Sequence, residues 1–155
     1  MTEIIRVDIY NRDVLVHCGS IKPLRKYLSK FLSQDAIKEI CDSLRECKLG
    51  RTLQIKDGGI LVYMPKEPSV AKDIGALVHE LFHAAYFILQ KAGIDCNDSA
   101  DEAYAYLLQF LSEKVFTSFS FHVQSPSRSD ASSHIQAERT DRCEHPSLSQ
   151  CTSLP

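Results

Sequence analysis

Two histidines one helical turn apart give this sequence its clearest chemical potential. The segment reads His79-Glu80-Leu81-Phe82-His83. In a helix, residues four positions apart lie on one face, so the two imidazoles can bind a single metal ion. A glutamate beside them can reach a water molecule on that ion and take its proton. The spacing therefore predicts a zinc site on a helix, with His79 and His83 as ligands and Glu80 as the general base.

The residues around this segment predict the helix that carries it. Apolar residues recur at helical spacing on the side opposite the histidines: Ile74, Leu77, Val78, Leu81, Phe82, Ala85, Ile88 and Leu89. Ser69 is a candidate N-cap and Gly93 a typical stop signal, so we expect a helix over about residues 69 to 92. The plain alternative is a pair of solvated histidines, with Glu80 in an ordinary helix ion pair. The polar side that both rings share favours the metal site.

A catalytic zinc ion needs a third protein ligand and keeps one position open for water. Glu102 is the preferred candidate, because it lies in the first turn of a second predicted helix, residues 99 to 116, on its polar side. A competing role exists, since Ser99-Ala100-Asp101-Glu102 matches the capping-box pattern, in which the glutamate bonds to the start of the helix. A capping carboxylate could not also bind zinc. Asp101 and Asp98 therefore remain open as alternatives.

The elements before the metal helix predict an α+β fold. They are, in order, a hairpin of residues 4–9 and 13–17, two helices within 21–48 that break near Gln34-Asp35, and a hairpin of residues 52–55 and 60–64. The second hairpin is the clearer one. Its turn, Lys56-Asp57-Gly58-Gly59, contains the Asp-Gly and Gly-Gly pairs that supply positive φ angles.

The character of the chain changes near residue 117. Residues 118 to 155 contain ten serines, few large apolar residues and no periodicity. Such a segment buries too little apolar surface to offset the entropy of ordering, so it predicts a disordered tail. The 155 residues then hold one folded domain, about residues 1 to 117.

Charge and composition exclude several classes of function. Lys and Arg total 18 against 20 Asp and Glu, which argues against a dedicated nucleic-acid binder. A short basic stripe is best interpreted as a solvated helix face: Lys22, Arg25, Lys26 and Lys30. No apolar run approaches the length of a membrane span. The six scattered cysteines and the lack of an export signal indicate reduced thiols in a cytoplasmic protein.

The motif and its surroundings resemble the zincin-like metallopeptidases, in the branch whose third ligand is a glutamate. Among them the chain looks like the small ImmA/IrrE-type and phage-associated members, over residues 52 to 116. The likeness rests on His79-Glu80-x-x-His83, on the hairpin before it, and on the helix Glu102-Ala-Tyr-Ala-Tyr-Leu-Leu after it. The Ala-Asn pair that often follows this glutamate in ImmA/IrrE-type proteins is absent.

The resemblance implies a small zincin-like domain that holds one Zn2+ ion through His79, His83 and Glu102, with Glu80 as general base. It also implies that the strand of residues 60–64 is the edge strand that pairs with an extended substrate. A tyrosine hydroxyl could stabilise the transition state, and four are available: Tyr63, Tyr86, Tyr104 and Tyr106.

The sequence thus predicts a cytoplasmic zinc peptidase that cuts a peptide or protein substrate, such as a regulatory protein, with neither nucleic acid nor membrane as a partner. One alternative is a non-catalytic zincin-like module that binds zinc and serves regulation or protein interaction. Retention of Glu80 argues against it, because that carboxylate is not needed merely to hold the metal. The other alternative is a zinc hydrolase that acts on a small amide.

Overall fold

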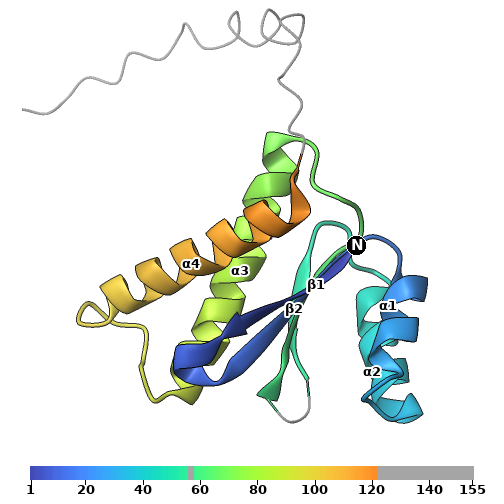
Figure 1. Ribbon diagram of the computed structural model, residues 1–155, viewed down its shortest axis with the longest axis horizontal. Helices are drawn as coiled ribbons and strands as arrows, with labels where there is room; N and C mark the ends of the chain where they lie inside the picture. Colours follow the sequence, from blue (N-terminus) through green and yellow to red (C-terminus); the bar gives the residue numbers. More distant parts are fainter. Residues whose placement is uncertain (56–57, 122–155) are drawn as a thin grey trace, which may run out of the picture. The chain divides into compact units, whose positions relative to one another are not determined.

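A computed structural model of the chain describes residues 1–55 and 58–121 (Figure 1). They form one mixed sheet of four strands in the order β1-β2-β4-β3. The strands are β1 (Thr2–Val7), β2 (Arg12–Cys18), β3 (Arg51–Gln54) and β4 (Ile60–Met64). Helices cover both faces of this sheet. The α+β class is confirmed.

The two predicted hairpins are both present and join into a single sheet. β1 and β2 are antiparallel and are linked by the short 3-10 helix η1 (Asp8–Tyr10), after which Asn11 takes a φ of 47°. β3 and β4 are also antiparallel, and the Ile55 amide donates to the Gly59 carbonyl at 2.7 Å. A parallel pairing of β2 with β4 connects the two hairpins. The predicted turn residues Lys56 and Asp57 lie outside the described residues.

The position of β4 corrects one expectation. The resemblance implies an edge strand at residues 60–64, but β4 lies between β2 and β3 and is an internal strand. All five of its residues are buried, because they are apolar or aromatic on both faces of the sheet. The edge is β3, where Arg51 and Gln54 are exposed. Any extended peptide that adds to this side of the sheet would therefore pair with β3.

Two helical layers enclose the sheet (Figure 1). The helices α1 (Ile21–Leu28) and α2 (Gln34–Leu44) pack with Leu15, Leu61 and Tyr63 on one face. The helices α3 (Ala71–Lys91) and α4 (Asp101–Phe119) build the larger core on the other face. None of the helices among the described residues has the length and apolar content that crossing a membrane requires.

Helix α3 begins two residues later than the sequence predicts. Val70, and not Ser69, occupies the N-cap position, and no side chain in the described part of the chain caps this helix start. The Ser69 amide instead donates to the buried Asp73 carboxylate at 3.4 Å, and Lys66 pairs with the same carboxylate at 2.9 Å. The Lys66 hydrogen bond holds the pKa of Asp73 below its ordinary value. The Asp73 carboxylate therefore ties the segment before the helix to its first turn, without capping the helix amides.

The end of α3 follows the prediction. Gly93 has a φ of 77°, its amide donates to the Gln90 carbonyl, and the Ile94 amide donates to the Leu89 carbonyl. These two bonds make a Schellman motif, in which a left-handed glycine closes the helix.

Helix α4 runs further than expected. It continues to Phe119, which is buried, and Phe119 stacks on Phe121 with ring centroids 5.3 Å apart. The folded part therefore extends past residue 117, where the sequence places its end. Most of the predicted tail, residues 122–155, lies outside the described residues.

His17 on β2 makes the stability of the fold depend on pH. Its ring is buried, with Nδ1 2.6 Å from the Thr2 hydroxyl and Nε2 3.0 Å from the Ser20 carbonyl. A neutral ring with its proton on Nε2 satisfies both contacts, since Nε2 then donates to Ser20 and Nδ1 accepts from Thr2. Burial lowers the pKa of His17 from its ordinary value of 6.5. Below about pH 6.5, the unfolded state therefore binds a proton at His17 more readily than the folded state does.

We expect the free energy of unfolding to fall as the pH drops from about 7 to about 5, because the unfolded state gains a proton there. The variant His17→Gln has no ring to protonate, so it should lose less stability over the same interval. Urea unfolding of both proteins at several pH values measures the difference. The other histidines contribute equally to the two proteins. Parallel pH dependences would contradict the assignment.

Candidate metal centre

The two predicted ligand histidines meet on the open side of α3. The Nε2 atoms of His79 and His83 are 3.0 Å apart, and their ring planes are nearly perpendicular at 84°. His79 is exposed and His83 is half-buried, so solvent reaches both. Two imidazoles on one tetrahedral zinc ion, at about 2.0–2.1 Å each, hold their nitrogens about 3.3 Å apart. The pair thus fits the first half of a zinc site, with an adjustment of a few tenths of an ångström.

The support for a metal site comes from the geometry of the two histidines. No protein-family model, curated protein or solved structure matches the chain. The chemical interpretation therefore rests on the pair of imidazole nitrogens and on Glu80, the next residue after His79 in α3.

Glu80 lies on the flank of α3 that faces β3. It is buried, although it is one of the few charged residues in the interior of the described part. The Thr52 hydroxyl lies 2.7 Å from Glu80 Oε2 and 2.9 Å from the Glu80 backbone carbonyl. Gly50 lies against the Glu80 side chain as well, so close that a Cβ there would come within 2.7 Å of Glu80 Cγ. The predicted general base is thus fixed by the start of β3.

The sequence alone does not mark these two neighbours of Glu80 as site residues. Thr52 is the first residue of a predicted strand, and Gly50 lies just before it. Both contacts join segments far apart in the chain; Thr52 and Glu80 are 28 positions apart. The only local signal is a glycine and a small hydroxyl residue at the entry of a strand that precedes the motif.

The predicted third ligand, Glu102, does not act as a helix cap. The Ser99 amide and hydroxyl both donate to Asn97 Oδ1, at 3.0 and 2.6 Å, and the Glu102 amide donates to Asp101 Oδ1 at 2.7 Å. Ala100 holds the N-cap position of α4, without a side-chain cap bond from the described residues. The capping box that the sequence allows is therefore not formed, and the exposed Glu102 carboxylate is not used in that way.

Glu102 also does not join the histidines in this arrangement. Within residues 1–55 and 58–121, no three His, Cys, Asp or Glu side chains gather closely enough to hold a metal, so Asp101 and Asp98 stay apart from the pair as well. Tyr104 packs against Phe82 of α3, with ring centroids 6.2 Å apart. Residues two apart in a helix point about 200° away from each other, so Glu102 points away from that contact. The third ligand stays a prediction.

The tyrosines expected near the site are placed very differently from one another. Tyr63 is buried on β4, among the residues that pack with α1 and α2 on the sheet face away from α3. The buried Tyr104 donates its hydroxyl proton to the Ile94 carbonyl at 3.0 Å. Tyr106 is 68% exposed and lines a different part of the surface. These three hydroxyls therefore have surroundings other than the histidine pair.

Tyr86 is the best-placed of the four. It lies three residues after His83 on the same helix, on the polar stripe that carries both histidines. Its hydroxyl accepts a hydrogen bond from Gln90 at 3.3 Å and is only half-buried. A hydroxyl held in this way keeps its own proton free to donate.

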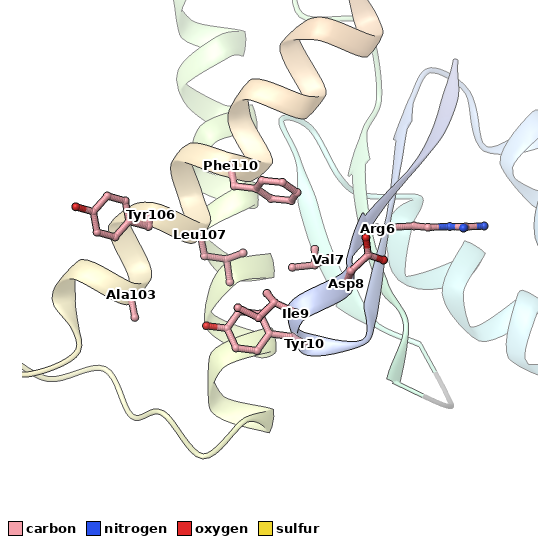
Figure 2. Close-up of a pocket in the computed structure, with 9 residues that line it drawn as sticks. All are labelled: Arg6, Val7, Asp8, Ile9, Tyr10, Ala103, Tyr106, Leu107 and Phe110. Carbon is pink, nitrogen blue, oxygen red and sulfur yellow. The ribbon is translucent and has the colours of Figure 1, made fainter.

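A groove of about 500 Å³ lies elsewhere, between the turn after β1 and helix α4 (Figure 2). Its walls are mainly apolar and include Tyr10, Leu107 and Phe110. Neither histidine of the pair nor Glu80 belongs to its lining. The groove and the candidate metal centre are therefore separate features of the surface.

Proposed function

We propose that this chain is a zinc-dependent peptidase, in which His79 and His83 bind the metal and Glu80 acts as the general base. The observation that carries the proposal is the pair of Nε2 atoms 3.0 Å apart. Glu80 follows His79 directly on the same helix, and Thr52 holds its carboxylate. Zinc bound by this pair would lower the pKa of a bound water toward about 7 and polarise the scissile carbonyl. Glu80 would take the proton of that water and pass it to the departing amine.

The edge strand supports a peptide as the substrate. β3 pairs with β4 on one side, and its other side is the end of the sheet. An extended peptide can add to such an edge through main-chain hydrogen bonds. Thr52 belongs to this strand and also contacts Glu80, so a peptide on β3 would run past the general base. We propose an extended segment of a peptide or protein, such as a regulatory protein, as the substrate.

The position of Glu102, away from the two histidines, favours a second candidate function. A catalytic zinc ion needs a third protein ligand, and Glu102 is exposed at the start of α4. A non-catalytic zinc-binding module for regulation or protein interaction would tolerate two protein ligands, with a partner supplying the third.

A peptide library separates these functions. The zinc-loaded chain is incubated with a library of peptides prepared from digested cell protein, and new ends are identified by mass spectrometry. We expect cleavage that o-phenanthroline abolishes and added zinc restores, because the metal supplies the nucleophile. Bound zinc without cleavage of any peptide would favour the module.

A further inference from the structure

The start of β3 is shaped around the side chain of Glu80. We propose that Thr52 is the positioning residue for the Glu80 carboxylate and that Gly50 is the glycine that leaves room for it. This inference rests on the proposed function, since it concerns the group assigned as general base. Two independent contacts support it, one polar and one steric.

The polar contact is the Thr52 hydroxyl. It lies within hydrogen-bond distance of Glu80 Oε2 and of the Glu80 main-chain carbonyl, at 2.7 and 2.9 Å. The hydroxyl has one proton and can donate to one of these oxygens at a time. Both acceptors belong to Glu80, so either choice ties the strand to this residue of the helix. Thr52 pairs with Val62 of the internal strand β4, which gives the hydroxyl a rigid base.

The choice of donor suits a general base. A carboxylate has two oxygens, and within the described residues the Glu80 carboxylate accepts a hydrogen bond on Oε2 from Thr52. Oε1 is thereby left for a water molecule. A hydroxyl fixes the side chain without adding a charge, whereas Lys or Arg at this place would form an ion pair with the base.

The steric contact is the missing side chain of Gly50. A Cβ at this position would lie 2.7 Å from Glu80 Cγ, 3.3 Å from Glu80 Cδ and 2.9 Å from Met64 Sδ. Gly50 has no left-handed φ that would itself require glycine. The close approach of Glu80 and Met64 is therefore the reason for a glycine here. Both side chains are buried and the added methyl group would be closest to Glu80, so it would disturb the position of the Glu80 side chain.

The first measurement needs neither metal nor substrate. The carboxyl carbon resonance of Glu80 is assigned in the metal-free chain by its absence in Glu80→Gln. Thr52→Val removes the hydroxyl and keeps the shape, whereas Thr52→Ser keeps the hydroxyl. We expect the resonance to move in Thr52→Val and to stay near its wild-type position in Thr52→Ser. An unmoved resonance in Thr52→Val would overturn the proposal.

The second measurement uses a library peptide that the zinc-loaded wild type cleaves. Misplacement of a reacting group by about 1 Å can cost up to about a hundredfold in rate, so kcat should fall at least about tenfold in Thr52→Val and in Gly50→Ala. KM and zinc content should be unchanged. The matched control is Gly75→Ala on α3, where a Cβ would meet nothing within 4 Å. Thr52→Ser and Gly75→Ala should both keep the wild-type kcat.

Negative results in the two measurements would contradict different claims. Equal kcat in wild type and Thr52→Val would overturn the positioning role. If Gly50→Ala melts at a much lower temperature than the wild type, the comparison of kcat between Thr52→Val and Thr52→Ser decides the positioning role. If the wild type cleaves no peptide, the peptidase function fails, and the carboxyl resonance still decides whether Thr52 fixes Glu80.

Discussion

Replacing both His79 and His83 with alanine should abolish zinc binding while the fold stays intact. The wild type should hold about one zinc ion per chain, because His79 and His83 form one pair of imidazoles that can bind a single ion together. Neither ring is part of the core: His79 is exposed and His83 half-buried on α3. Alanine favours the helix, so the far-UV circular dichroism of the metal-free variant should match that of the wild type. Metal analysis after exhaustive dialysis measures the loss.

The control lies on the same helix face. Lys72 is exposed on α3, on the polar side that also carries the histidines, so Lys72→Ala makes a similar surface change without touching the pair. It should bind as much zinc as the wild type. If the double histidine variant held as much zinc as the wild type, His79 and His83 could not be the metal ligands. The same assay applied to Glu102→Ala, Asp101→Ala and Asp98→Ala identifies the third ligand as the variant with the largest loss of affinity.

What the sequence predicts well here is local. Helix α3 follows from the apolar periodicity between residues 74 and 89, and its end follows from Gly93, because both signals arise within a few turns of chain. Its start is less predictable. Ser69 is a good capping residue by type, but Val70 takes the N-cap position, while the Ser69 amide and Lys66 both bond to Asp73. Competing side chains within one turn are enough to move a boundary.

What the sequence does not predict depends on pairings between distant segments. The parallel alignment of β2 with β4 makes β4 internal and leaves β3 at the edge, and no local pattern specifies that neighbour. The contact of Thr52 with Glu80 exists only because of this arrangement. The polar side of α4 is predictable, since Tyr104 and Leu107 are buried as their spacing requires. Whether this polar side faces the histidines depends on how α4 crosses α3.

Replacing Glu80 with glutamine should leave zinc in place and nearly abolish hydrolysis. A general base contributes about 10²–10⁴ in rate, so kcat on a cleaved library peptide should fall by at least about a hundredfold. The zinc content should not change, because in the proposed site the histidine nitrogens would bind the metal and the Glu80 carboxylate would not. Glutamine keeps the shape of the side chain and offers an amide oxygen to the Thr52 hydroxyl, so the fold should persist. Steady-state kinetics and metal analysis on the same preparation measure both quantities.

The matched control is Glu3→Gln, which makes the same change of charge on a half-buried residue of β1, the strand at the opposite edge of the sheet from β3. It should keep wild-type kcat and zinc content. A Glu80→Gln protein that cleaves as fast as the wild type would exclude Glu80 as the base, since a neutral amide cannot accept the proton of the attacking water. For a zinc-binding module, in contrast, the wild type and Glu80→Gln would bind a partner equally well, because the side chain at this buried position would then only hold the strand to the helix. The comparison of zinc content with kcat therefore separates a carboxylate that does chemistry from one that supports the fold.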